Sequence, residues 1–490
     1  MKKIHLSMIN LWCNKNLVDS QLFLWKLLSE NWDKIEYCAD PYEKNVEIIV
    51  LNTCSFISSG REEMFKTVEK ILWKKKKVCI IWCGVQYFEK LLKRASPLHS
   101  EPHPNSLLLG DGIRNRGNLK GGKDSLFLIG GDTQRAEVVL KQELERWDKM
   151  IKNENVFYLS RNDLTLANLQ SLISRSQNFD DFCRYSAPRL LTNYENRYEY
   201  IKIAEWCNNS CAFCIIPQIR WKLTSLPIKS VLVEAENLLK QWIEELIIVA
   251  QDTMRYGTDF SSKSQLLPLL DKLDRLPYDF KYRVLYLYPD ILTLKQLEEF
   301  ASLEKFIPYF DIPLQHISPK LLKSMGRFYD DKMIHTLLKW IRSLFPKAFI
   351  RTNIIIWFPW ETEEDMRLLQ SFLNEDYFDN IALFEYHDEP LAKSSTFENK
   401  IPYSTIHKRF SIIRKQVYGL LNSRQARRKW KNQIGFVESI DQLNGQIFLS
   451  IRPEINCPEI DPVDEIILEN VVQCFDGDEI EIGSKVEYVA

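Results

Sequence analysis

The chain has 490 residues, which predicts roughly three domains of ordinary size. Hydrophobic residues make up 45% and charged residues 27%, so the composition is typical of a folded globular protein and excludes a disordered one. No apolar run approaches the roughly 18 residues of a membrane span, and the N-terminus lacks the apolar core of a signal peptide. We therefore expect a cytoplasmic protein whose 11 cysteines serve metal binding or redox chemistry rather than disulfides.

The first 133 residues are predicted to form a small α/β domain. Apolar runs at 4–11, 46–52 and 78–81 predict buried strands, and the spacing over 62–72 predicts a helix between the last two. The stretch 96–132 is rich in Pro, Gly and Asn and predicts a long irregular loop.

The central part of the chain is predicted to be a second α/β domain over 196–425, reached through a charged, mostly helical connection over 134–195. Apolar runs alternate with helical segments, and this order is typical of a parallel sheet that forms a barrel or part of one. The six strand candidates are Tyr200–Ala204, Leu246–Ala250, Val284–Tyr288, Ile307–Ile312, Ile350–Ile356 and Ile381–Tyr386.

The end of the chain combines a basic helix with an acidic β-rich module. Residues 405–433 have helical spacing, and 408–431 carry nine Lys or Arg and no acid. Short alternating runs predict an all-β module over 426–490, in which 436–490 carry 13 Asp or Glu against Arg452 and Lys485. The overall net charge of -1 hides this asymmetry. An acidic module would repel a phosphate backbone and suits a basic partner.

The strongest chemical signal is the loop Cys207-x-x-x-Cys211-x-x-Cys214, which follows the first strand candidate of the central domain. Thiolates at this spacing wrap around a single inorganic centre, and they suit an iron–sulfur cluster or zinc. A structural zinc site needs a fourth ligand, but no further Cys or His lies within fifteen residues on either side. We therefore favour a four-iron cluster with one iron left open for a ligand.

Three more cysteines, Cys13, Cys54 and Cys83, each follow a strand candidate of the first domain. Because the carboxyl ends of parallel strands share one sheet edge, these thiols are expected to meet there. A second cluster is the favoured interpretation, and buried free cysteines are the alternative. The remaining cysteines show no such arrangement, and we take them as structural: Cys38, Cys79, Cys183, Cys457 and Cys474.

With these motifs the sequence resembles the radical S-adenosylmethionine (SAM) methylthiotransferase family. The resemblance rests on the cysteine loop with Phe213 before its last cysteine, the three N-terminal cysteines, and the string Asn52-Thr53-Cys54-Ser55. Within the family it is closest to the type that modifies an aspartate of ribosomal protein S-twelve, through the strings at 251–260, 285–290 and 310–318. The implied fold is an N-terminal methylthiotransferase domain, a partial (β/α)6 barrel, and a C-terminal β-barrel called TRAM.

The resemblance also implies the cofactors and the activity. Cys207, Cys211 and Cys214 would hold a 4Fe-4S cluster that binds SAM, and reduction of the cluster would generate a radical that abstracts hydrogen from the substrate. Cys13, Cys54 and Cys83 would hold a second 4Fe-4S cluster that delivers the methylated sulfur. The implied partners are basic ribosomal protein S-twelve and an electron donor such as flavodoxin or ferredoxin.

By analogy, side chains at the strand ends of the central domain would bind SAM. For the Gln315–His316 pair the alternative is that the two residues cap a strand, and Arg351 and Asp290 have equally plausible structural roles. The candidates are Phe213, Gln251, Asp252, Thr253, Gln315, His316, Trp357, Phe358, Pro359, Trp360 and Glu361.

Tryptophan stands where the family has glycine at nine positions. The chain holds only 16 glycines against 13 tryptophans, whereas glycine averages about 7% of residues. The pattern suggests UGA codons that some bacteria read as glycine and that are rendered here as tryptophan. The nine positions are Trp12, Trp25, Trp32, Trp82, Trp206, Trp221, Trp242, Trp357 and Trp360.

Two other functions remain as alternatives. One is a tRNA methylthiotransferase that modifies isopentenyl-adenosine. The other is a degenerate, non-catalytic metal-binding protein of the ribosome, which real tryptophans at these positions would favour.

Overall fold

The structure is a computed structural model that divides into two compact units. Unit 1 comprises 1–192, 206–222 and 387–399, and unit 2 comprises 193–205, 223–386 and 400–490. Within the part of the chain that the structure describes, no helix is both long and apolar enough to cross a membrane. The described residues are 3–11, 14–31, 35–53, 58–82, 85, 87–88, 90–91, 133–153, 155–159, 189, 191, 197–219, 222–401, 403–426, 431–443, 445–477 and 479–490.

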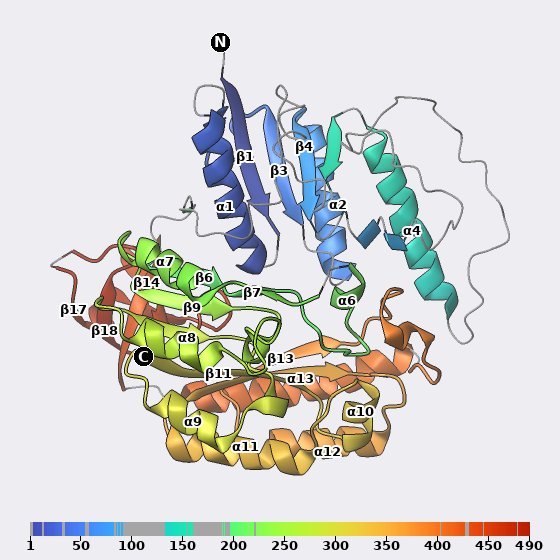
Figure 1. Ribbon diagram of the computed structural model, residues 1–490, viewed down its shortest axis with the longest axis vertical. Coiled ribbons are helices and arrows are strands. Elements are labelled where there is room, and N and C mark those ends of the chain that lie inside the picture. Colours follow the sequence, from blue (N-terminus) through green and yellow to red (C-terminus); the bar gives the residue numbers. More distant parts are fainter. Residues whose placement is uncertain are drawn as a thin grey trace. The chain divides into compact units, whose positions relative to one another are not determined.

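Unit 1 contains a five-stranded parallel sheet in the order β2-β1-β3-β4-β5 (Figure 1). This confirms the α/β fold expected for the N-terminal domain. The strands are β1 (Ile4–Asn10), β2 (Ile35–Tyr37), β3 (Ile48–Thr53), β4 (Lys77–Trp82) and β5 (Val156–Leu159), and the helices are α1 (Asn14–Asn31), α2 (Ser58–Trp73) and α4 (Thr133–Ile151).

Alternate residues of the central strands point to opposite faces of this sheet, and each face is covered by helices. Ile48 and Val50 pack with Phe23 and Leu27 of α1. Ile49 and Leu51 belong to a second core that includes the apolar faces of α2 and α4. The stretch 134–195, expected as a mostly helical connection, thus begins with a helix and a strand that belong to the first domain's sheet and core.

Unit 2 contains a six-stranded sheet in the order β13-β12-β11-β10-β9-β6, in which all neighbours are parallel. Helices follow the strands, so the expected partial barrel is confirmed (Figure 1). The strands are β6 (Tyr198–Lys202), β9 (Glu245–Val249), β10 (Lys281–Val284), β11 (Phe306–Gln315), β12 (Phe349–Ile356) and β13 (Asn380–Glu385). The helices are α7 (Ile228–Leu239), α8 (Leu266–Asp274), α9 (Leu294–Ala301), α10 (Pro319–Ser324), α11 (Asp331–Leu344) and α12 (Glu363–Leu373).

The C-terminal part of unit 2 is an antiparallel sheet in the order β16-β15-β14-β18-β17, as expected for a TRAM module. Arg452 of this sheet binds Glu245 of β9 at 3.1 Å, and Glu245 also pairs with Arg283 of β10. This buried ionic contact fixes the small sheet to the barrel. The elements are α13 (Tyr403–Ala426), β14 (Asn432–Leu443), β15 (Gln446–Pro453), β16 (Asp464–Ile467), β17 (Val471–Cys474) and β18 (Lys485–Val489).

Short elements complete the described chain. The strands β7 (Ala204–Glu205) and β8 (Thr224–Ser225) pair with each other. The helix α6 (Ile216–Ile219) directly follows the cysteine loop.

Candidate active site

The three-cysteine loop lies in unit 1 and is continuous with its hydrophobic core. Ile215 and Ile219 of the segment after the loop pack in the core cluster formed by α2, α4 and the first sheet. The backbone N–H of Ser394 donates to the carbonyl oxygen of Ala212 at 2.8 Å, and this bond ties the loop to the segment 387–399. The loop is therefore held from two sides.

Within the loop, the three thiols form no disulfide and are partly exposed. Cys214 N–H donates to the carbonyl oxygen of Cys211 at 3.1 Å, which closes a tight turn between the last two cysteines. Phe213, the aromatic residue of the motif, lies between them in the sequence and is half-buried. Among the described residues, no group of three His, Cys, Asp or Glu side chains is placed to hold a metal ion.

A buried ion-pair cluster, formed by Arg61, Glu143 and Glu389, joins α2, α4 and the segment 387–399 of unit 1. The Arg61 guanidinium lies 2.9 Å from Glu143 and 3.0 Å from Glu389, and its side chain is 4% exposed. It also stacks over the Tyr87 ring at 4.3 Å. Because Ser394 of the same segment bonds the cysteine loop, this cluster contributes to holding the loop against the N-terminal domain.

Cys13, Cys54 and Cys83 lie outside the described residues, but the strands that precede them end in register. Asn10 pairs with Asn52 and Asn52 with Ile81 in the sheet. The Asn52 amide donates to Asn10 at 3.1 Å and to Ser20 at 2.7 Å, so polar side chains close this edge. The three strand ends thus share one sheet edge, as the sequence predicted.

Three of the remaining cysteines, Cys38, Cys79 and Cys457, are buried, and burial raises the pKa of the Cys79 thiol to about 12. Cys474 is partly exposed on β17, and Cys183 lies outside the described residues.

In unit 2, the expected SAM-binding residues follow β9, β11 and β12, and so lie at the carboxyl edge of the parallel sheet. Thr253 donates its hydroxyl to the carbonyl oxygens of Leu285 and Tyr286 at 2.6 and 2.9 Å, which ties the β9 end to the β10 end. Asp252 is 1% exposed and lies 3.2 Å from Arg255. Gln251 presents a buried amide oxygen without a hydrogen bond among the described residues.

Gln315 is the last residue of β11, and His316 follows it. Gln315 has a φ of +73°, and His316 is fully buried. The His316 Nδ1 accepts the Ser318 N–H at 2.9 Å, so this nitrogen is unprotonated. Burial lowers the pKa of His316 to about 4, and the ring is therefore neutral near pH 7.

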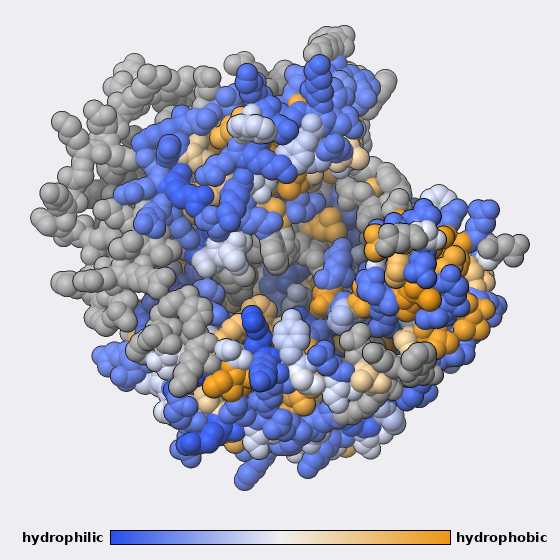
Figure 2. All heavy atoms as spheres, turned by 180° about the vertical axis from the view of Figure 1, so that it is seen from behind, coloured by the Kyte–Doolittle hydropathy of each residue, from blue (hydrophilic) through white to orange (hydrophobic). Residues whose placement is uncertain are grey.

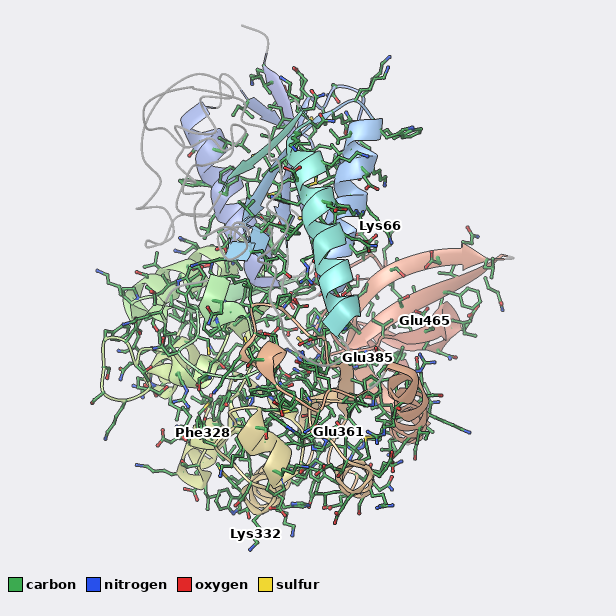
Figure 3. All side chains as sticks on the ribbon, turned by 90° about the vertical axis from the view of Figure 1, so that its right-hand side faces the viewer. Lys66, Phe328, Lys332, Glu361, Glu385 and Glu465 are labelled. Atoms are coloured by element: carbon green, nitrogen blue, oxygen red, sulfur yellow. The ribbon has the colours of Figure 1, made fainter. Side chains whose placement is uncertain are left out.

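Glu361, labelled in Figure 3, belongs to unit 2, is 5% exposed and lies near this histidine. Its Oε2 accepts the Trp357 N–H at 2.6 Å and lies 3.9 Å from His316 Nε2. Its Oε1 lies 3.9 Å from the Arg409 guanidinium. Burial raises the pKa of Glu361 to about 8 because neither neighbour is close enough to offset the lost hydration.

The remaining candidates form the turn between β12 and α12. Phe358 is fully buried and packs edge-to-face on Tyr386, with ring centroids 5.4 Å apart. Pro359 and Trp360 occupy the middle of the turn, which the Glu361 N–H closes by donating to the Phe358 carbonyl oxygen at 3.0 Å. Phe358 and Pro359 thus have packing and turn roles in this structure.

Several charged residues near these candidates were not singled out as site residues. Arg351 lies within β12 and binds Asp311 of β11 at 2.8 Å, which is the structural salt bridge expected as its alternative role. Asp290 pairs with Arg255, and burial raises the pKa of Asp290 while Arg255 opposes that shift. Arg409 comes from α13, about 50 residues beyond the turn in the chain, so no local spacing could have found it.

Two protein-family models match parts of the chain. Residues 201–373 match the model of the radical SAM superfamily, and residues 5–100 match a model described as uncharacterized protein family UPF0004. A radical SAM methyltransferase structure, TsrM from Kitasatospora setae, is similar at 13% identity and a TM-score of 0.47, over 78% of this chain and 75% of that one. The barrel, the cysteine loop and the family match define a radical SAM enzyme.

Three relatives, all ribosomal protein uS12 methylthiotransferases, show which radical SAM family this chain belongs to. The ribosomal protein uS12 methylthiotransferase RimO of Clostridium botulinum is 31% identical over 82% of this chain and 79% of its own. RimO of Chlamydia abortus is 30% identical over 94% of this chain and 88% of its own, and RimO of Dictyoglomus thermophilum is 29% identical over 99% and 97%. The chain belongs to the radical SAM methylthiotransferase family that these RimO proteins represent.

Membership implies a 4Fe-4S cluster and SAM, and the described residues fit the cluster. The three thiols form no disulfide, are partly exposed and lie within one short loop. Thiolates are the ligands that such clusters take, and three of them leave one iron open.

Proposed function

We propose that this protein adds a methylthio group to the β-carbon of an aspartate of ribosomal protein uS12 by radical SAM chemistry. The observation that carries the proposal is the Cys207-Cys211-Cys214 loop, in a chain whose RimO relatives align over most of its length. When bound and reduced, the cluster supplies the radical chemistry, while the protein holds the loop and excludes water.

The second 4Fe-4S cluster is part of this proposal, with Cys13, Cys54 and Cys83 as its ligands. The support is the register of β1, β3 and β4, because each cysteine follows a strand that ends at the same sheet edge. The electron donor is proposed to be a small redox protein of the flavodoxin or ferredoxin class.

The surface of the C-terminal module supports a basic protein as the partner. The acidic side chains include Glu465, which is exposed on β16 and labelled in Figure 3. Figure 2 shows apolar side chains gathered over the region of this sheet, and the exposed ones there are Ile434, Ile440, Leu443, Val472, Phe475 and Ile482. A surface that is both acidic and apolar suits a basic protein better than a phosphate backbone.

The basic helix α13 is already partly neutralised within unit 2. Arg409 binds Glu363, and Arg424 binds Asp376 at 3.0 Å and Asp379 at 2.5 Å. These arginines therefore fix the helix to the barrel, which weakens the case for an RNA-binding role of this segment.

The test is an anaerobic assay of the reconstituted full chain with SAM, dithionite and uS12. We expect about eight iron atoms per chain and a methylthio mass increase on one aspartate peptide. Cys211→Ala should abolish the modification and remove about four iron atoms, and Cys13→Ala should remove about four others. Cys474→Ala is the matched control and should leave both readouts unchanged. Modification of tRNA but not of uS12 would favour the tRNA enzyme, and zinc or no metal would refute the enzyme altogether.

A further inference from the structure

Four tryptophans of this chain have a left-handed backbone that suits glycine. Their φ angles are +73° at Trp206, +66° at Trp242, +69° at Trp357 and +70° at Trp360. Tryptophan accounts for 13 of 490 residues, yet it supplies four of the ten non-glycine residues with positive φ in the described chain. A side chain at positive φ crowds the backbone, whereas glycine has no Cβ to crowd it.

Trp360 stands in the position of a type II turn where glycine is required. The turn runs from Phe358 to Glu361 and is closed by the bond between the Glu361 N–H and the Phe358 carbonyl oxygen. Pro359 occupies the second position, which proline favours, and Trp360 the third, which needs a positive φ. The chain thus has every feature of a Pro-Gly turn except the glycine.

Trp242 and Trp206 have the same backbone angle in connections between elements. Trp242 lies three residues after the end of α7, just before β9, and its side chain is 85% exposed. Trp206 directly precedes Cys207 and is 5% exposed. An exposed indole makes few contacts that offset the strained backbone, so packing does not explain Trp242.

Trp357 is the most deeply buried of the four, because it is 1% exposed. Its indole packs on Phe410 with ring centroids 5.5 Å apart, and its Nε1 has no hydrogen bond among the described residues. Buried polar atoms are nearly always satisfied, so a buried indole N–H without a partner adds to the strain of the positive φ.

We propose that the functional protein carries glycine at positions 206, 242, 357 and 360. The cell that makes the protein would read the codon UGA as glycine, whereas the sequence above gives tryptophan at these codons. This inference does not depend on the proposed function, because it uses only backbone angles, composition and burial.

Trp147 provides the matched control for a genuine tryptophan. It lies inside helix α4, is 1% exposed, and stacks on Phe88 with ring centroids 4.5 Å apart and an interplanar angle of 11°. Its backbone is helical and its ring fills the core, so glycine there would leave a cavity. We expect its codon to be UGG and the four others to be UGA.

Tandem mass spectrometry of the protein from the cells that encode it tests the proposal directly. We expect glycine in the peptides that cover positions 206 and 357, and tryptophan in the peptide that covers position 147. Tryptophan at 206 and 357 would overturn the proposal and leave the degenerate paralogue as the better interpretation.

A second measurement uses two full-length recombinant variants. The double variant Trp242→Gly, Trp360→Gly should raise the midpoint of thermal unfolding relative to the parent chain, because it relieves two positive φ angles at positions whose side chains are not buried. Trp147→Gly should lower the midpoint. An unchanged or lower midpoint in the double variant would contradict the proposal, whatever the enzyme's activity.

Discussion

Each unit of this protein buries a cluster of ionisable side chains, and the two clusters differ in how fully they are paired. In unit 1, Arg61 lies within 3.0 Å of both Glu143 and Glu389. In unit 2, Glu361 is 3.9 Å from both His316 and Arg409. The first cluster is joined by direct ion pairs, whereas Glu361 has no cationic group closer than 3.9 Å among the described residues. We call Glu361, His316 and Arg409 the unpaired cluster. Because its charges are weakly compensated, burial raises the pKa of Glu361 to about 8.

The largest expected effect comes from breaking the paired cluster. Arg61→Met leaves Glu143 and Glu389 buried without their cation, and such a loss typically costs about 3–5 kcal/mol. Anaerobic urea unfolding measures it. The control is Arg146→Met on α4, whose partners Glu62 and Glu69 are half-exposed, so its cost should stay below about 1 kcal/mol. Equal losses in the two variants would mean that the Arg61 cluster adds nothing beyond a surface salt bridge.

This cluster also shows where sequence reasoning stops. Arg61 and Glu389 are 328 residues apart, and neither belongs to a spacing pattern that predicts a contact. Five of the six barrel strands were predicted because each is a short apolar run between helical segments, which is a local signal. The predicted strand Val284–Tyr288 was misplaced, since β10 (Lys281–Val284) ends where it begins and the apolar run continues into the loop after the strand. The cysteine loop was singled out by a local signal too, since its three cysteines lie within eight residues.

At the tryptophan positions, the sequence predicted a feature of the backbone, namely a conformation that suits glycine. Four of the nine proposed glycine positions have positive φ. Trp25 lies within helix α1, where the backbone makes no such demand, and the side chain of Trp82 on β4 is not described. Trp12, Trp32 and Trp221 lie outside the described residues.

An intermediate effect is expected from the pH dependence of the unpaired cluster. Burial raises the pKa of Glu361 from 4.5 to about 8, so the folded protein keeps a proton that the unfolded chain releases above its ordinary pKa. Stability should therefore fall as pH rises from 4.5 to about 8, by up to about 1.4 kcal/mol per pH unit. The unfolding free energy of the parent and of Glu361→Gln should be measured across this pH range. The parent should show this decrease with pH, and Glu361→Gln should lack it.

His316 acts in the opposite direction over part of this range. Its pKa falls from 6.5 to about 4 in the folded state, so stability is lost as pH falls below 6.5. The two effects oppose each other below pH 6.5, and the Glu361 slope is clearest between 6.5 and 8. Trp357→Gly should admit water, lower the pKa of Glu361 and flatten that slope. A slope unchanged in Trp357→Gly would show that the indole is not what isolates the carboxyl group.

The smallest expected effect comes from removing the helix cap of α12, and we expect it to be independent of the titration of Glu361. Thr362 caps α12 immediately after Glu361, and its side chain and Asp365 form a reciprocal capping box. Thr362→Ala removes one helix cap and should cost about 1 kcal/mol. Because Asp365 accepts the Ser318 hydroxyl at 2.6 Å and its pKa is held below its usual range, this cost should be constant between pH 5 and pH 8. If the free-energy cost of Thr362→Ala grew with pH, the helix cap would be linked to the titration of Glu361. The electrostatic influence of Glu361 would then reach the first turn of α12.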